Sequence, residues 1–189
     1  MNLNYRLILA SKSPRRQELL KSLDIDFEVE VKPIDESFPL STPPLDVAEF
    51  IAKKKSNAFG RLGKTDLLLT SDTVVIVDEQ ILGKAANEKD AFEMISMLSD
   101  NTHKVATGVC LRTSEKTVSF TAVTRVSFDK LDSEAINYYI DTYKPYDKAG
   151  SYGIQEWIGM IGINQIEGDY YNVMGLPLNM LYKHLKEFA

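Results

Sequence analysis

The stretch Leu67-Leu68-Leu69-Thr70-Ser71-Asp72-Thr73-Val74-Val75-Ile76-Val77 decides the fold. It contains two runs of β-forming residues that are interrupted only by Ser71 and Asp72, and Asp78-Glu79-Gln80 then forms a plausible turn into Ile81-Leu82. Aliphatic and β-branched residues in such runs favour largely buried strands. The sequence therefore predicts a central sheet whose apolar pattern is interrupted by one carboxylate, Asp72.

Helical and strand patterns alternate on both sides of this stretch. Upstream, we expect a strand at 7–10, a helix that begins at Pro14 with Ser13 as its N-cap, a half-exposed strand at 27–31 and a helix over 45–59. Downstream, we expect a helix capped by Asn87, strands at 105–112, 117–128 and 160–166, a helix over 133–142 and a last helix from Pro177. This order predicts an α/β fold, a mixed sheet flanked by helices, in one domain over residues 1–189.

The composition is typical of one globular domain. Of 189 residues, 44% are apolar and 26% are charged, and 27 acidic against 22 basic residues leave a net charge of −5. Because domains that bind nucleic acids usually carry a basic excess, we expect no nucleic-acid polymer as partner. No apolar stretch approaches the roughly 20 residues that span a bilayer, and no signal-peptide core begins the chain. We therefore expect a cytoplasmic protein that makes no membrane contact.

Metal-binding side chains other than carboxylates are scarce. One cysteine, Cys110, lies in an apolar run and is expected to be buried, and His103 is expected to be a hydrogen-bonded structural residue. With His184 as the second histidine, a His/Cys zinc site is improbable, so any metal would be held mainly by carboxylates.

The turn Ser11-Lys12-Ser13-Pro14-Arg15-Arg16 joins the first strand to the first helix. A helix N-terminus offers free N–H groups and the positive end of its dipole, to which this turn adds hydroxyl and guanidinium groups. The turn is therefore either a phosphate-binding cradle or a solvated helix cap, and the residues alone leave both interpretations open.

Two charged side chains lie among apolar ones. Lys55 shares a helix face with Val47, Ile51 and Ala58, so it either extends past the edge of the core or points into an anion site, and spacing alone favours the first. Its neighbours at 53 and 54 are expected to face solvent. Asp72 is costly to bury unpaired, so a strand end, a bulge or a functional site must accommodate it, and we favour the site.

Three further motifs are weak by themselves. Asp35-Glu36 lies in a loop, Gly83-Lys84 lies between a strand and a helix cap, and Gln155 follows a glycine-rich turn. Lys84 is placed where it could meet a phosphate, and the amide of Gln155 offers the paired donor and acceptor that a nucleobase edge requires.

Taken in order, these motifs resemble the Maf family of nucleoside triphosphate pyrophosphatases. The matching blocks are Leu9-Ala10-Ser11-Lys12-Ser13-Pro14-Arg15-Arg16, Asp35-Glu36, Ala52-x-x-Lys55, Ser71-Asp72-Thr73-Val74-Val75, Leu82-Gly83-Lys84, His103-x-Val105-x-Thr107-Gly108, Asp147-Lys148-Ala149-Gly150-x-Tyr152-Gly153-Ile154-Gln155 and Asn172-Val173-x-Gly175-Leu176-Pro177-Leu178. The resemblance implies an elongated, two-lobed fold related to the inosine triphosphate pyrophosphatases, a divalent cation such as Mg²⁺ or Mn²⁺, and a homodimer. It also implies cleavage of a nucleoside triphosphate to monophosphate and pyrophosphate, which is the activity of a nucleoside triphosphate diphosphatase.

The resemblance also implies a substrate and roles for particular residues. Members with Arg, Thr and Gln at the positions of Arg15, Thr73 and Gln155 prefer dTTP and UTP, whereas those acting on 7-methyl-GTP carry an aromatic residue, Gln and Glu there. Asp72 would be the proton acceptor and, with Glu36, a metal ligand, while Lys55 and Lys84 would assist catalysis. The substrate-binding residues would be Ser11, Ser13, Arg15, Arg16, Thr73 and Gln155.

The same cationic cleft is compatible with two other functions. One is a non-catalytic nucleotide-binding regulator of septum formation, since the family is linked to cell-division arrest as well as to sanitation of the nucleotide pool. The other is a general phosphatase. A pure binding protein gains nothing from a carboxylate beside a triphosphate without a metal, because like charges repel, and this favours the enzyme. The chain departs from the family pattern at Ala85, Asp100 and Glu156, where Pro, Gly and Gly are usual, and Glu156 is expected to change the rim of the base pocket.

Overall fold

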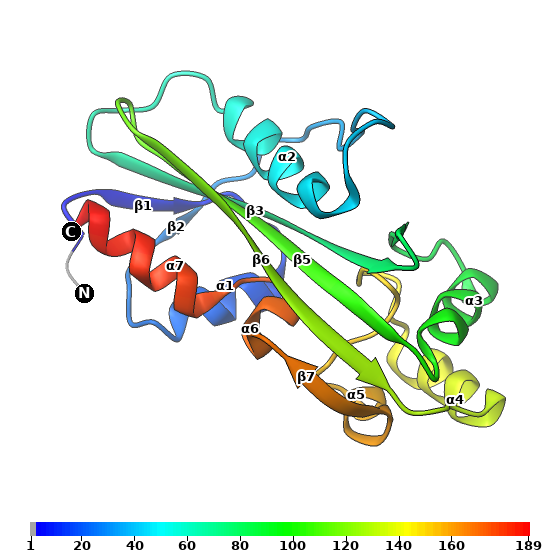
Figure 1. Cartoon of the computed structure of the whole chain (residues 1–189). Helices are drawn as coiled ribbons and strands as arrows, with labels where there is room; N and C mark the ends of the chain where they lie inside the picture. Colours follow the sequence, from blue (N-terminus) through cyan, green and yellow to red (C-terminus); the bar gives the residue numbers. More distant parts are fainter. Residues whose placement is uncertain (1–2) are drawn as a thin grey trace.

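A computed structural model describes residues 3–189 and confirms a mixed sheet flanked by helices (Figure 1). Met1 and Asn2, which open the segment in which no signal peptide is expected, lie outside the described residues. The strands are β1 (Arg6–Leu9), β2 (Glu28–Val29), β3 (Asp66–Val77), β4 (Gln80–Leu82), β5 (Thr102–Arg112), β6 (Thr117–Phe128) and β7 (Ile163–Glu167). The helices are α1 (Pro14–Lys21), α2 (Pro44–Asn57), α3 (Glu88–Leu98), α4 (Ser133–Tyr143), α5 (Trp157–Gly162), α6 (Tyr170–Val173) and α7 (Leu178–Leu185), followed by a 3₁₀ turn (Lys186–Phe188).

The sheet has the strand order β2-β1-β3-β5-β6-β7, and β4 pairs with β3 beside this path. β1 runs parallel to β2 and β3, whereas the other pairs are antiparallel. Figure 1 shows the long strands β3, β5 and β6 crossing the whole molecule, with α2 on one side of them and α1 and α7 on the other. No helix within residues 3–189 is long and apolar enough to span a membrane.

β3 is one continuous strand of twelve residues, so the expected interruption at Ser71 and Asp72 is wrong. β5 pairs with β3 along this whole region, from Leu68 to Ile76, and supplies the hydrogen bonds that keep the strand regular. On its other edge, β3 pairs with β1 only as far as Leu69 and with β4 only from Val75. Residues 70–74 of β3 therefore form an edge that no strand of the described chain covers, and this uncovered edge accommodates the polar residues.

Side chains of β3 alternate between two faces of the sheet. Leu67 and Leu69 pack with β1, α1 and α7, whereas Val75 and Val77 pack on the same face with α3, α4 and α5. These are two separate core clusters at opposite ends of one face, so the molecule has two lobes. Ser71 and Thr73 lie on this face of β3 between the two core clusters.

The opposite face is covered by α2, which approaches the sheet closely at Gly108 of β5. A Cβ atom at this position would lie 2.2 Å from the backbone nitrogen of Glu49 and 2.3 Å from the carbonyl carbon of Ala48. Thr70 adds a hydrogen bond by donating its hydroxyl to the carbonyl of Ala52 (2.7 Å). Close packing against glycine therefore sets the height of α2 above the sheet.

The strand expected at 160–166 is partly wrong, because residues 157–162 form α5 and the strand begins only at Ile163. Ile158 and Gly162 lie one helical turn apart and are both buried, with Ile158 in the core cluster below α3 and α4. A short apolar run does not by itself distinguish such a helix turn from a strand. The four-residue α6, capped by the side chain of Asp169, was not expected from the sequence either.

Cys110 is buried, as expected, and His103 is buried as well. The Nε2 atom of His103 lies 2.7 Å from the hydroxyl of Tyr152, and the ring also packs near Phe128. His103 is therefore a structural residue with a side-chain hydrogen bond.

Burial of His103 makes the protein less stable in mild acid. Burial lowers the pKa of its imidazole from 6.5 to about 4. Between these values the unfolded chain binds the proton and the folded chain does not, so stability is complete above pH 6.5 and falls as the pH decreases toward 4. We expect a loss of about 2 kcal/mol at pH 5 relative to pH 7.5, measured by urea unfolding. His103→Gln should lack this loss and His184→Gln should retain it; an unchanged pH dependence in His103→Gln contradicts the assignment.

Candidate active site

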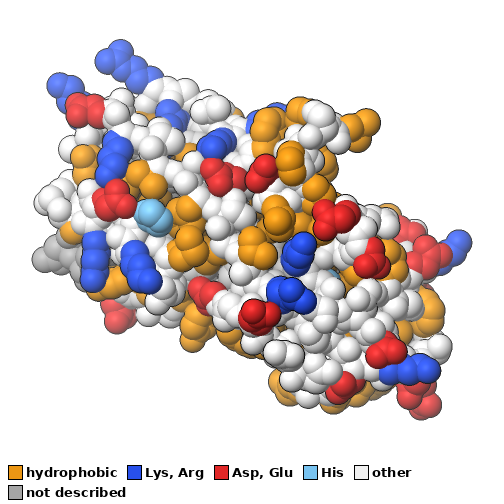
Figure 2. All heavy atoms as spheres, viewed as in Figure 1, with side chains coloured by type: hydrophobic (Ala, Val, Ile, Leu, Met, Phe, Trp, Pro, Cys, Tyr) orange, Lys and Arg blue, Asp and Glu red, His pale blue; other side chains and the backbone are white. Residues whose placement is uncertain are grey.

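A cavity of about 370 Å³ lies beside the uncovered edge of β3. Its walls come from the start of α1, the loop before α2, α2 itself, the end of β4 and the segments 147–155 and 173–175. The two lobes thus meet at this cavity. Figure 2, drawn from the side of Figure 1, shows an indented outline between the part of the molecule that carries α2 and the part that carries α3 and α4.

Lys55 and Asp72 form a largely buried charged pair in the wall of the cavity. The Nζ atom of Lys55 lies 2.7 Å from Oδ1 of Asp72 and 2.9 Å from Oε1 of Glu36. The side chains of Lys55 and Asp72 are only 16% and 15% exposed, because α2 covers this face of β3. The structure thus corrects the interpretation that spacing alone favoured: Lys55 points into a site rather than past the edge of the core.

Glu36 is held in the site by positive charge. Burial alone would raise the pKa of its carboxyl, but the hydrogen bond and the attraction of Lys55, with smaller attractions from Lys84 and Arg16, lower that pKa overall. The neighbouring lysine, Lys54, also contacts this loop: its amine donates to the carbonyl of Ser37 (2.8 Å). Lys54 therefore has a structural contact, which corrects the expectation that it only faces solvent.

Arg16 fills the uncovered edge of β3. Its guanidinium donates to the carbonyls of Ser71 (3.2 Å) and Gly175 (2.8 Å) and to the hydroxyl of Thr73 (2.9 Å). The hydroxyl of Thr73 also lies 2.9 Å from that of Thr107 on β5. Burial lowers the pKa of Arg16, and the negative charge of Asp72 opposes this effect. Arg16 and Thr73 line the cavity, but the contacts of Arg16 are with the protein itself.

The turn before α1 contributes unequally to the cavity. Ser13 and Arg15 line it, whereas Ser11 does not and is buried behind the helix end. The hydroxyl of Ser13 caps α1 by accepting from the backbone N–H of Arg16 (3.4 Å), and the hydroxyl of Ser11 accepts from the N–H of Ser13 (3.2 Å). Arg15 reaches across the cavity to Asp147 (2.7 Å).

Lys84 and Gln155 face the cavity from the other lobe. Lys84 follows β4, and its backbone pairs with Ala149, while the N–H of Gly150 donates to the carbonyl of Gly83 (2.9 Å). These contacts hold the segment that ends in Gln155 against the end of β4. Within residues 3–189, Lys84 makes no ion pair with a carboxylate and so presents an uncompensated positive charge.

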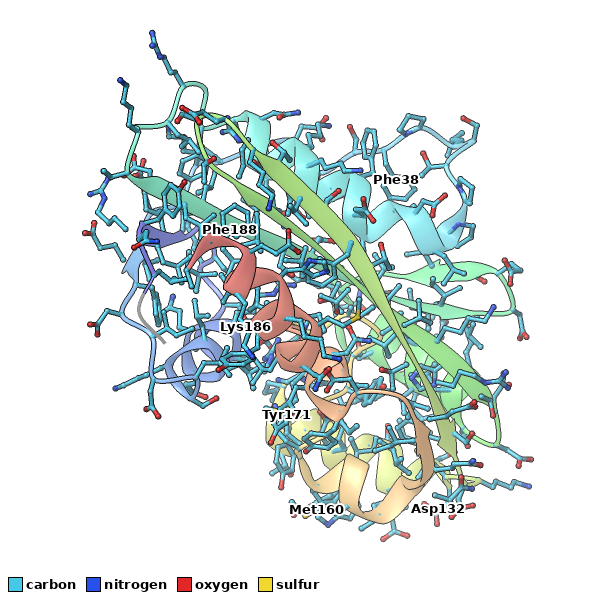
Figure 3. The ribbon with its side chains drawn as sticks, turned by 60° about the vertical axis from the view of Figure 1, so that its left-hand side comes forward. Phe38, Asp132, Met160, Tyr171, Lys186 and Phe188 are labelled. Carbon is cyan, nitrogen blue, oxygen red and sulfur yellow. The ribbon has the colours of Figure 1, made fainter. Side chains whose placement is uncertain are left out.

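The sequence did not single out several residues that line the cavity. Asp147, Lys148 and Tyr152 belong to a block that resembles the family, but no local pattern distinguished them, and nothing in the sequence pointed to Phe38. Figure 3 labels Phe38, which lies beside α2 at the loop that also carries Glu36.

The three departures from the family pattern lie in different surroundings. Asp100 has a φ angle of 56°, in the left-handed region that glycine adopts most easily, and Ala85 is buried in a core cluster. The carboxylate of Glu156 contacts the hydroxyl of Tyr139 and lies 3.1 Å from the amine of Lys148. Glu156 thus joins a network beneath the turn that carries Gln155.

Known proteins resemble this chain over almost its whole length. The family model described as Maf-like protein matches residues 6–188. A dTTP/UTP pyrophosphatase of Parabacteroides distasonis is 51% identical over 186 residues, which are 97% of this chain and 96% of that protein. A dTTP/UTP pyrophosphatase of Flavobacterium psychrophilum is 52% identical over 183 residues, which are 96% of this chain and 94% of that protein.

A solved structure shares the fold at much lower sequence identity. The HAM1 protein from Coxiella burnetii superposes with a TM-score of 0.52 at 16% identity, covering 97% of this chain and 99% of that one. This likeness confirms the architecture expected from the sequence motifs. The family model that matches residues 6–188 and the two relatives of about 50% identity show that the chain belongs to the family of Maf-like proteins.

Proposed function

We propose that this protein is a nucleoside triphosphate pyrophosphatase that converts dTTP and UTP to the nucleoside monophosphate and pyrophosphate. The observation that carries this proposal is the Glu36-Lys55-Asp72 cluster in the wall of a cavity of nucleotide size. Two relatives of about 50% identity named dTTP/UTP pyrophosphatase support the choice of substrate.

The charges around the cavity suit a triphosphate. Five cationic side chains line it against three carboxylates, which leaves an excess of two positive charges; the cations are Arg15, Arg16, Lys55, Lys84 and Lys148, and the carboxylates are Glu36, Asp72 and Asp147. Because the protein as a whole carries −5, the residues outside the cavity are net negative, and the cavity differs from them in the sign of its charge. It attracts a small anion, whereas the rest of the surface repels a nucleic-acid polymer.

The residues also fit a divalent cation. Glu36 and Asp72 both direct a carboxylate oxygen to within 2.9 Å of the same lysine amine, so one ion could contact both. Mg²⁺ is commonly bound by one or two carboxylates together with substrate phosphates. Residues 3–189 contain no group of three or more His, Cys, Asp or Glu side chains that could hold an ion alone, so phosphate oxygens and water would complete its coordination. When bound, Mg²⁺ or Mn²⁺ would neutralise phosphate charge and acidify water.

Different side chains of the cavity have different roles in the reaction. Asp72 accepts a proton from the water that attacks the α-phosphorus, and Lys55 orients its carboxylate through the 2.7 Å contact. The bond between the α-phosphorus and the bridging oxygen breaks, and the electron pair leaves with pyrophosphate. Lys84 stabilises the charge that develops on this leaving group, whereas Arg15 binds the nucleotide in the ground state and the transition state alike. Thr73 and Gln155 are assigned to selection of the pyrimidine base.

A nucleotide panel tests this proposal. We expect dTTP and UTP, incubated with the protein and Mg²⁺ or Mn²⁺, to yield monophosphate and pyrophosphate faster than purine triphosphates do. Lys84→Met should lower kcat by roughly 100-fold because it removes an uncompensated cation from the leaving-group side. Products are separated by anion-exchange chromatography, with Lys89→Met on the surface of α3 as the control. Release of diphosphate and orthophosphate would contradict the cleavage site, and binding without turnover would favour the regulatory alternative.

We also infer a homodimer and a cytoplasmic location. The resemblance to Maf proteins supports the dimer, and so do exposed apolar side chains near the edge strand β7, namely Met160 and Ile161 of α5 and Ile166 of β7. In Figure 3, Met160 lies at the outer side of α5, well separated from Phe188 at the end of the C-terminal helix. Light scattering coupled to gel filtration measures the mass, and 21.3 kDa would exclude the dimer.

A further inference from the structure

The ion pair between Arg15 and Asp147 crosses the cavity from one lobe to the other. Arg15 lies in the first turn of α1, which packs on β1 and α7, whereas Asp147 follows α4 in the other lobe. The Nη1 atom of Arg15 donates to Oδ2 of Asp147 at 2.7 Å. The second oxygen of the same carboxylate, Oδ1, accepts from the amine of Lys148 at 2.9 Å. Both oxygens of Asp147 are therefore occupied by cations that line the cavity.

The pair continues into a buried network. Lys148 also contacts Glu156 (3.1 Å), and the other carboxylate oxygen of Glu156 contacts the hydroxyl of Tyr139 on α4. That hydroxyl accepts from the backbone N–H of Gly153 (3.0 Å), two residues before Gln155. The side chains of Lys148 and Glu156 are only 10% and 19% exposed. The inner end of the network is thus fixed to α4, and its outer end holds Arg15.

The Arg15–Asp147 pair orients the guanidinium of Arg15 but contributes little to the stability of the fold. The side chain of Asp147 is 58% exposed, and an ion pair in such a position contributes only about 0–1 kcal/mol to folding. Burial raises the pKa of Asp147, but the hydrogen bonds from Lys148 and Arg15 outweigh it and bring the pKa to about 2, so the carboxylate is ionised at neutral pH. Arg15 uses one N–H group on Asp147 and, of its five donors, keeps the rest available.

We propose that Asp147 is a positioning residue that holds the guanidinium of Arg15 over the nucleotide site, while Lys148, Glu156 and Tyr139 anchor Asp147. The proposal rests on the proposed function in one respect, namely that Arg15 contacts the nucleotide. Asp147 itself repels phosphate and acts only through Arg15. Removing its charge therefore leaves Arg15 in the cavity but releases it from the orientation in which it meets the substrate.

A double-mutant cycle tests this role. Asp147→Asn keeps the size of the side chain and removes its charge, so we expect a 10-fold or greater rise in KM for dTTP with kcat changed by less than twofold. The Kd for α,β-imido-dTTP with Mg²⁺, measured by calorimetry, should rise by the same factor, and Tm should change by less than about 2 °C, since a pair at the rim contributes little stability. In an Arg15→Met background, Asp147→Asn should have no further effect on this Kd.

Asp141→Asn removes an exposed carboxylate on α4 whose one ion pair within the described part of the chain is with Lys144 at 3.6 Å, and it should leave Kd and KM unchanged. Glu156→Gln should weaken binding in the same direction as Asp147→Asn, again only when Arg15 is present. An equal effect of Asp147→Asn with and without Arg15, or no effect in either background, overturns the proposal. If the wild-type protein binds the analogue but releases no pyrophosphate from dTTP, the proposed function fails, and the binding cycle still decides the role of Asp147.

Discussion

Replacing Asp72 by Asn is expected to lower kcat for dTTP by about 10³-fold while the protein remains folded. The amide has the same shape and its oxygen still accepts from Lys55, but it cannot take a proton from the attacking water. Lys55 also keeps its 2.9 Å contact with Glu36, so the substitution does not leave a buried ammonium unpaired. The loss should appear in kcat more than in KM, because the proton is transferred only in the transition state.

Glu49 provides a matched control for this substitution. It is another half-buried carboxylate on the side of the sheet covered by α2, where it contacts Lys53 and accepts from the hydroxyls of Ser119 and Thr121, but it does not line the cavity. Glu49→Gln should therefore retain normal turnover. Release of pyrophosphate is followed with purified variants whose melting temperatures are also measured. An Asp72→Asn protein with kcat within tenfold of wild type would remove Asp72 from its role as proton acceptor.

Gly108→Ala is expected to destabilise the protein by about 3 kcal/mol, at the upper end of the usual effect of overpacking. The new methyl group would meet the backbone of α2, which cannot rotate away as a side chain can. The melting temperature should fall by roughly 6–12 °C for a chain of this size. Gly108 is also the residue of β5 that pairs with Asp72. Lifting α2 at this point should lengthen the contact between Lys55 and Asp72 and reduce turnover in the fraction that folds.

Gly83→Ala is the control for this prediction. No atom lies within 4 Å of a Cβ built at Gly83, and its φ angle lies outside the left-handed region. Its free energy of unfolding should change by less than about 0.5 kcal/mol, as is usual for a surface substitution. Both variants are compared by thermal unfolding followed by circular dichroism. A Gly108→Ala protein that melts within 2 °C of wild type would contradict the close approach of α2.

Features that depend on neighbouring residues were predictable from the sequence. Ser13 caps α1 and Asn87 caps α3, as predicted, because a cap is a hydrogen bond to an N–H group only a few residues away. Asp72 was recognised as a site residue because an unpaired carboxylate is costly in an apolar strand. The family resemblance then predicted the order of the site segments, and the structure brings most of them to one cavity.

Features that depend on register and on distant contacts were not predictable. Spacing alone mispredicts the position of Lys55, because its partners, Asp72 and Glu36, are known only once α2 is placed on β3. Asp147 lies 132 residues from Arg15, and no local pattern reports a contact over that separation. The continuity of β3 through Asp72 likewise depends on pairing with β5, a strand that begins 25 residues after β3 ends.

The sheet has the fewest strands at the uncovered edge of β3. In the described chain, a row of the sheet through Leu68 crosses five strands, from β2 to β6, and a row through Ile76 also crosses five, from β4 to β7. The row through Asp72 crosses only β3, β5 and β6. The guanidinium of Arg16 fills part of the edge that is left without a strand, and the cavity lies beside it, so the depth of the cavity depends on the sheet as well as on the surrounding loops. Changes in loop length can alter the entrance to this cavity, whereas a strand that paired along residues 70–74 of β3 would close it.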